Sequence, residues 1–173
     1  MVAVKNQGKA YPFGYSQYEE NGEQITNFAL YSSVADAVEL CLFENGKQEQ
    51  RFVMHRSENV WHIALSGVAN GMQYGFRITA ENDRTLANPN KLMLDPYAKA
   101  VVGKPDLSSP EMRSIFQLND PRDNAECAPK GQIIETTFDW QNDKAPKTPW
   151  AETVIYELSV KGFSQLRTDL PEK

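Results

Sequence analysis

Between Ile25 and Ala80 the chain consists of short apolar-rich runs separated by turn residues, and this pattern constrains the fold more than any other feature. The runs recur about every 8–12 residues without helical periodicity between them, which is typical of an antiparallel β-sandwich. We find no convincing amphipathic helix before residue 95. The sequence therefore predicts an all-β, immunoglobulin-like sandwich.

Alternation of side chains assigns a face to each predicted strand. The run ITNFALYS places Phe28 and Leu30 among more polar neighbours, as in a half-buried strand. The run AVELCLF has two faces, with Val38, Leu40 and Leu42 on one and Glu39, Cys41 and Phe43 on the other. Two later runs align Trp61, Ile63 and Leu65, and then Met72, Tyr74, Phe76 and Ile78. We expect these aligned apolar sets to face the core.

Turn residues join the predicted strands. Asn45-Gly46 tolerates positive φ at both central positions, so it predicts a tight type I′ hairpin. The return strand is expected from Glu49 to His55, and the next turn at 57–59. By analogy with the tyrosine corners of related sandwiches, we expect the Tyr74 hydroxyl to tie a sheet corner.

The pattern changes after Ala80. Prolines within the segment AENDRTLANPNKLMLDPYAKAVVG remove ladder donors, so a regular central strand is not expected there. The apolar residues of this segment predict an ordered strap, which closes a module of residues 1–103. Residues 104–152 contain six prolines and are expected to form an extended connector, with one helical turn near Pro110–Phe116 and one strand at Gln132–Thr136. The apolar, β-branched run TVIYELSVKGF predicts a strand buried on both faces, so residues 153–173 are expected to begin a new domain.

Charge and composition exclude several classes of protein. A net charge of −5 without clustered cations argues against a nucleic-acid partner. No apolar run approaches the roughly 20 residues that span a bilayer, and the first residues lack the apolar core of a signal peptide. We therefore expect no membrane partner and a cytoplasmic location. Cys41, in an apolar run far from Cys127, is expected to be a reduced core thiol.

Motifs for metals and cofactors are missing from the sequence. The two histidines, His55 and His62, have no acidic or cysteine ligands at metal spacing beside them. There is also no phosphate-binding P-loop, no dinucleotide-binding G-x-G-x-x-G and no G-x-S-x-G. We predict no metal site and no cofactor.

Several segments together resemble the glycogen-debranching enzymes of the isoamylase type, in the α-amylase clan. They are YPFG with NFALYS and VELCLFENG, then VWHIALSGVANGMQYGFRI, NPNKLMLDPYAKAVVG, and finally APKGQI, FDW and TPWAETVIYELSVKGFSQL. The matches follow the order of the family from about Tyr11 onward, and NPNKLMLDPYAKAVVG is the most specific of them. The chain departs from the family at Ser159, where many relatives carry histidine.

This resemblance implies an early-set sandwich of the glycogen-binding type, followed by the first strand of an incomplete (β/α)₈ barrel. It also implies a parent enzyme that hydrolyses α-1,6 branch linkages of glycogen or limit dextrin. Retaining hydrolysis needs two carboxyl groups about 5–5.5 Å apart, which a barrel supplies from the ends of several strands. Since only about 20 residues follow Thr153, we predict no catalytic residue here and no activity of the fragment alone. Glu157 is interpreted as a polar residue of the barrel core.

An α-glucan partner would stack its C–H faces on flat aromatic rings. The candidates are Trp61, whose strand face also indicates a core role, and Trp140, which is expected either to be exposed for sugar or to pack on the barrel. Trp150 is interpreted as an inter-domain anchor. Two other functions remain open: a free-standing glycogen- or starch-binding module with a targeting or regulatory role, and a purely structural interaction domain.

Overall fold

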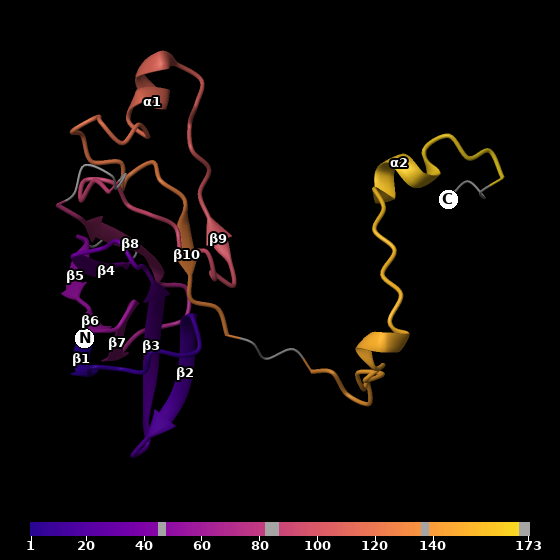
Figure 1. The fold of residues 1–173 in the computed structure, drawn as a ribbon, viewed down its shortest axis with the longest axis horizontal. Helices are drawn as coiled ribbons and strands as arrows, with labels where there is room; N and C mark the ends of the chain where they lie inside the picture. Colours follow the sequence, from indigo (N-terminus) through magenta and orange to yellow (C-terminus); the bar gives the residue numbers. More distant parts are fainter. Residues whose placement is uncertain (45–47, 82–86, 136–138, 170–173) are drawn as a thin grey trace. The chain divides into compact units, whose positions relative to one another are not determined.

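The computed structural model describes residues 1–44, 48–81, 87–135 and 139–169 (Figure 1). The chain divides into two compact units, Met1–Thr136 and Thr137–Lys173. Every strand of the described residues belongs to the first unit. No helix in the described part of the chain has the length and apolar character needed to cross a membrane.

The first unit consists of two antiparallel sheets. The first sheet has the order β1-β7-β3-β2, with β6 also paired to β7, and its strands are β1 (Ala3–Asn6), β2 (Gly14–Glu20), β3 (Glu23–Tyr31), β6 (His55–Ser57) and β7 (Val60–Ser66). The second has the order β5-β4-β8-β10-β9, with β4 (Ala37–Phe43), β5 (Gln50–Val53), β8 (Gln73–Thr79), β9 (Val101–Val102) and β10 (Lys130–Gln132). The predicted all-β immunoglobulin-like sandwich is confirmed.

The core lies between the two sheets and follows the predicted alternation. Strand β4 directs Val38, Leu40 and Leu42 into the main core, where they pack with the aligned residues of β7 and β8. Its opposite face directs Cys41 into a second, smaller cluster. Cys41 is fully buried and has a free thiol, as expected. Because both faces of β4 are covered, its alternating side chains enter two separate clusters.

Strand β3 differs from the half-buried strand that we predicted, because it is buried on both faces from Ile25 to Leu30. The N-terminal segment covers its outer face: the Asn27 side chain accepts a hydrogen bond from the Lys9 N–H at 2.7 Å and donates one to the Lys9 carbonyl at 2.9 Å. The His62 ring on β7 lies within hydrogen-bond distance, 2.7 Å, of the Gln7 carbonyl. Local alternation does not reveal a cover that comes from another part of the chain.

The predicted return strand from Glu49 to His55 is divided between the two sheets. Strand β5 pairs with β4 in the second sheet, whereas β6 pairs with β7 in the first. The chain crosses between them at Met54, which is buried in the core. The turn at 57–59 is present, with Glu58 at a positive φ of 54°. The predicted Asn45-Gly46 hairpin lies outside the described residues.

The sandwich unit extends well beyond residue 103, where we predicted the module to end. Strand β10 lies between β8 and β9 in the second sheet, and Ile133, which follows it, belongs to the main core. The predicted strand at Gln132–Thr136 is thus found slightly earlier, at Lys130–Gln132. The predicted helical turn is α1 (Pro110–Ser114), where the Ser109 side chain caps the helix by accepting from the Met112 N–H. Much of the proline-rich stretch is therefore part of the sandwich.

The second unit contains two short helices, η1 (Trp150–Glu152) and α2 (Val160–Ser164). The predicted apolar strand starting at Thr153 is not formed: residues 154–158 have no ladder partner in the described chain, and Val154, Ile155 and Tyr156 are exposed. Ser159 caps α2 by accepting a hydrogen bond from the Gly162 N–H. A strand requires a neighbouring strand for its backbone hydrogen bonds, and this unit supplies none among its described residues.

Candidate functional site

The structure separates the two tryptophans that we considered for sugar stacking. Trp61 on β7 is only 5% exposed, and its indole N–H donates to the Ser32 carbonyl at 3.4 Å. The Arg56 guanidinium lies 5.5 Å from the centre of its ring. The burial of Trp61 and the hydrogen bond of its indole match the core role that the strand face indicated, so Trp61 has no open ring face for a glucan.

The other candidate aromatics lie in the unit Thr137–Lys173. Trp140 is 64% exposed, and Trp150 at the start of η1 is exposed still further. Glu157, interpreted as a polar residue of a barrel core, is exposed in this unit. Of the residues singled out for sugar contact, only Trp140 keeps an accessible ring.

Two buried tyrosines fasten the strap and strand β10 to the sandwich. The Tyr74 hydroxyl donates to Asp95 Oδ2 at 2.7 Å, so it binds a side chain of the strap. The Tyr15 hydroxyl instead binds the backbone that follows β10: it donates to the Ile134 carbonyl and accepts from the Ile134 N–H, both at 3.0 Å. Burial raises the pKa of Tyr74 and of Asp95, since water no longer solvates their charged forms.

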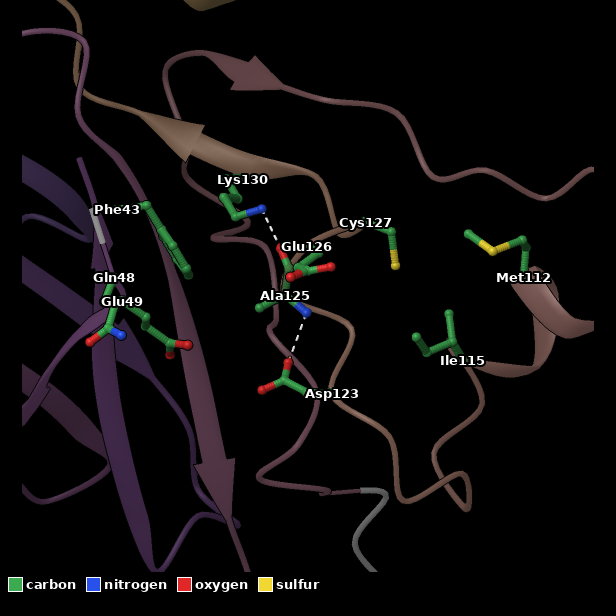
Figure 2. Close-up of a pocket in the computed structure, with 10 residues that line it drawn as sticks. All are labelled: Phe43, Gln48, Glu49, Met112, Ile115, Asp123, Ala125, Glu126, Cys127 and Lys130. Atoms are coloured by element: carbon green, nitrogen blue, oxygen red, sulfur yellow. Dashed lines mark hydrogen bonds between the residues drawn. The ribbon is translucent and has the colours of Figure 1, made fainter. Parts of the chain in front are cut away.

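Sequence reasoning missed a pocket on the outer side of the second sheet. Its volume is about 680 Å³, and ligand pockets usually measure about 300–1,000 Å³. Figure 2 shows Met112 and Ile115, from α1 and the residue after it, on one side and Phe43 and Glu49 on the other. The lining combines apolar side chains with carboxylates, and the carboxylates are those of Glu49, Asp123 and Glu126. These residues come from two distant parts of the sequence, 43–49 and 112–130, so no local motif marks the pocket.

A buried arginine organises the charged side of this pocket. The Arg77 side chain is only 1% exposed, and its Nε and Nη2 donate to the two carboxylate oxygens of Glu49 at 2.8 and 3.0 Å. Nη2 also donates to both oxygens of Asp123, at 3.0 and 2.8 Å, and Nη1 donates to the Pro89 carbonyl at 3.0 Å. Arg77 thus joins β8, the strap and the 120–130 loop. A lone arginine in the run QYGFRIT gives no sequence signal for such a network.

The electrostatics of the pocket do not fit acid catalysis. Burial by itself would raise the pKa of Glu49, but hydrogen bonds from Arg77 and Cys41 and the charges of Arg77 and Arg51 lower it to about 2. Glu49 is therefore ionised at neutral pH and cannot donate a proton. Both of its charged oxygens accept hydrogen bonds from Arg77, and Oε1 also accepts one from Arg51.

The pocket lining also includes a buried cation. Lys130 Nζ donates to the carbonyls of Ala125 and Ala128 and lies 5.0 Å from the centre of the Phe43 ring. Burial lowers the pKa of Lys130, because the charged ammonium is poorly solvated there. These contacts hold the 124–130 loop against the second sheet.

The described residues contain no group of three or more His, Cys, Asp or Glu side chains arranged to hold a metal ion. His62, one of the two histidines considered above, makes hydrogen bonds through both ring nitrogens, to the Gln7 carbonyl and to Ser57 Oγ at 2.8 Å.

Replacing Glu49 with glutamine is expected to weaken the acid dependence of folding. The pKa of Glu49 in the folded chain, about 2, is below its ordinary 4.5, so the unfolded chain binds the proton first as the pH falls. The stability contributed by this carboxylate is complete above pH 4.5 and disappears toward pH 2. We expect Glu49→Gln to unfold more easily at pH 7, by about 1–3 kcal/mol, and to lose less stability between pH 5 and about pH 3 than the unchanged protein.

Urea denaturation at pH 7, 5 and 3 would measure this difference. The exposed Glu19 on β2 provides the matched control, because Glu19→Gln removes the same charge outside the Arg77 network. Stability curves of Glu49→Gln and the unchanged protein that run parallel over this pH range would contradict the prediction.

Comparison with known proteins places the chain in a family. Residues 12–98 match the model of carbohydrate-binding module 48, the isoamylase N-terminal domain. The "Glycogen operon protein GlgX homolog" of Haemophilus influenzae is 58% identical over 99% of this chain, and the "Glycogen debranching enzyme" of Klebsiella pneumoniae is 43% identical over 95%. This chain covers 25% of each of these two relatives.

Solved structures include a similar chain, the catalytic module of the glycogen-degrading pneumococcal virulence factor SpuA. It is 18% identical, with a TM-score of 0.49, over 73% of this chain and 17% of that one. Because this family model matches residues 12–98, which are half of the chain, the chain belongs to the carbohydrate-binding module 48 family, the isoamylase N-terminal domain.

Proposed function

We propose that this chain is the N-terminal module of a glycogen-debranching glycosidase that hydrolyses α-1,6 branch linkages in glycogen or limit dextrin. The observation that carries the proposal is the match, over nearly the whole chain, to a relative named for the glycogen operon at 58% identity and to one named for glycogen debranching at 43% identity. The chain spans about a quarter of the length of these relatives. In this proposal the catalytic carboxylates belong to the remaining three quarters.

The role of the module in this proposal is to pack on the catalytic barrel and to contact glucan. The chemistry of the described residues supports a non-catalytic role, since Glu49, the most buried carboxylate of the pocket, is ionised and held by Arg77. The exposed apolar residues 154–156 also support it, because such side chains require cover from a further domain. The alternative of a free-standing glucan-binding module leaves these residues without a role.

The activity is tested with a polypeptide as long as the relatives and with the 173-residue chain. Each is incubated with glycogen limit dextrin, and new reducing ends and released oligosaccharides are measured. The proposal predicts debranching by the long polypeptide and none by the short one. A long polypeptide that binds glycogen and releases nothing would contradict it.

The glucan contact is expected at Trp140, whose ring is accessible. One aromatic contact contributes about 0.5–1.5 kcal/mol, so Trp140→Ala is expected to weaken glucan binding about two- to tenfold. Affinity electrophoresis of the 173-residue chain in gels containing glycogen measures this as reduced retardation. Trp150→Ala, which removes another exposed indole of the same unit, is the matched control and is expected to leave retardation unchanged.

A third variant separates this contact from the pocket. If Glu126→Ala abolished retardation while Trp140→Ala left it intact, the sugar would bind in the pocket of Figure 2 and the assignment to Trp140 would be wrong.

A further inference from the structure

Four aromatic side chains form a partly exposed cluster on the sandwich unit, which we call the aromatic patch: Tyr11, Phe13, Tyr31 and Tyr97. Phe13 is its centre, with ring-centre distances of 6.0 Å to Tyr11, 6.5 Å to Tyr31 and 5.3 Å to Tyr97. The three tyrosines are 75%, 54% and 51% exposed, respectively. Neither the core nor the pocket explains this cluster.

The patch is held in place by contacts beneath it. Gly14, next to Phe13, has a φ of 77°, and a Cβ atom at Gly14 would lie only 2.8 Å from the Tyr97 Cβ. Asp95 accepts hydrogen bonds from the Tyr97 N–H through Oδ1 at 2.8 Å and from the buried Tyr74 hydroxyl through Oδ2 at 2.7 Å. The strap is therefore anchored in the core at the residue that positions Tyr97. A preorganised surface loses little conformational entropy when it binds a partner.

The orientation of the rings favours a protein partner over a sugar. The planes of Tyr11, Tyr31 and Tyr97 are inclined to that of Phe13 by 72°, 65° and 44°, so the patch is corrugated and is not one flat platform. Clustered tyrosine and phenylalanine side chains are enriched at the centres of protein interfaces, where neighbouring side chains fill the gaps between them.

We propose that the aromatic patch is the surface on which the catalytic barrel docks. This inference rests on the proposed function, and it specifies which face of the module the barrel covers. The relatives contain about three times as much further polypeptide as this chain provides, and that polypeptide requires a contact surface on the module. Exposed aromatic side chains that cluster and are held rigidly constitute such a surface.

Acetylation of tyrosine hydroxyls by N-acetylimidazole, mapped by mass spectrometry, tests the inference. In the 173-residue chain Tyr11, Tyr31 and Tyr97 are expected to react. In a polypeptide of the relatives' length they are expected to be protected. Tyr18, on β2 outside the patch, is the internal control and is expected to react equally in both. Equal reactivity of the patch tyrosines in the two polypeptides would overturn the proposal.

A sugar site is an alternative that the same assay detects. Adding maltoheptaose to the 173-residue chain is expected to leave acetylation of the patch unchanged. Protection by maltoheptaose would overturn the docking proposal and make the patch a glucan site. Debranching by the long polypeptide, measured on the same preparation, separates this outcome from a failure of the proposed function: activity without protection refutes only the docking surface, and protection without activity refutes only the enzymatic assignment.

A substitution provides a second readout. Tyr97→Ala is expected to lower the melting temperature of the long polypeptide more than that of the 173-residue chain, because in the short chain the ring loses its contact with Phe13 but has no barrel contact to lose. Tyr18→Ala is the matched control and is expected to affect the two polypeptides equally. An equal shift of both polypeptides by Tyr97→Ala would contradict the proposal.

Discussion

A chain that ends at Gly103 is expected not to fold, whereas a chain that ends at Thr136 is expected to unfold cooperatively as the intact sandwich does. Ending at Gly103 removes β10 from its place between β8 and β9 and removes Ile133 from the main core. Truncating a buried isoleucine to alanine alone costs about 2–5 kcal/mol, and the total stability of a domain is only about 5–15 kcal/mol. The Tyr15 hydroxyl would also lose both of its partners on Ile134.

Circular dichroism during thermal unfolding, together with amide proton dispersion in NMR spectra, would distinguish the two truncated chains. The 1–136 chain is the matched control, since it lacks the whole second unit and keeps every described strand. A 1–103 chain with a cooperative transition close to that of the 1–136 chain would show that the sandwich does not depend on β10.

Arg77→Leu is expected to destabilise the sandwich unit by about 3–5 kcal/mol, since removing one partner of a buried ion pair leaves uncompensated charge behind. The carboxylates of Glu49 and Asp123 would lose their hydrogen bonds from the guanidinium, and the Pro89 carbonyl would lose its donor. Urea denaturation at pH 7 measures the loss. The network joins β8 to the strap and to the loop after α1, so the change also loosens the pocket.

The matched control is Arg122→Leu. Arg122 pairs with Asp120, but half of its side chain is exposed, so water screens the pair and the expected loss is small. Combining Arg77→Leu with Glu49→Leu should recover part of the loss, because both members of the pair are then apolar. If Arg77→Leu and Arg122→Leu cost the same, Arg77 would not be a central element of the fold.

The two proposed contacts assign different tasks to different parts of the chain. The aromatic patch is assigned to the catalytic barrel, and Trp140 is assigned to glucan. The pocket beside Arg77 combines apolar walls with the ionised carboxylate of Glu49, which Arg77 holds.

Local sequence patterns predicted the strands and their faces well. The alternation in AVELCLF and VWHIALS assigned the core residues of β4 and β7, including Leu40 and Ile63, as the structure has them. The helical turn predicted near Pro110–Phe116 is present as α1. These features depend on residues that are close together in the sequence, so local patterns are enough to predict them.

The surroundings of Trp61, the Arg77 network and the aromatic patch were harder to predict from local sequence patterns. Trp61 is an aromatic residue on a strand, and the sequence alone left open whether it faces sugar or the core. Arg77 lies on β8 and Glu49 lies just before β5, and their pairing appears only when β5 and β8 flank β4 in one sheet. The clustering of Phe13 with Tyr97 needs the strap to return to the start of β2.

The sequence by itself determined the fold class, the core face of most strands and the membership in a family of carbohydrate-binding modules, because alternation, turn residues and ordered segment matches are properties of the linear chain. The tertiary structure alone decided that β10 belongs to the sandwich, that Trp61 is buried, and that Arg77, Glu49 and Asp123 form one network. Each of these depends on contacts between segments that are far apart along the chain. Such contacts are selected by the packing of the whole core, and no short run of residues encodes them.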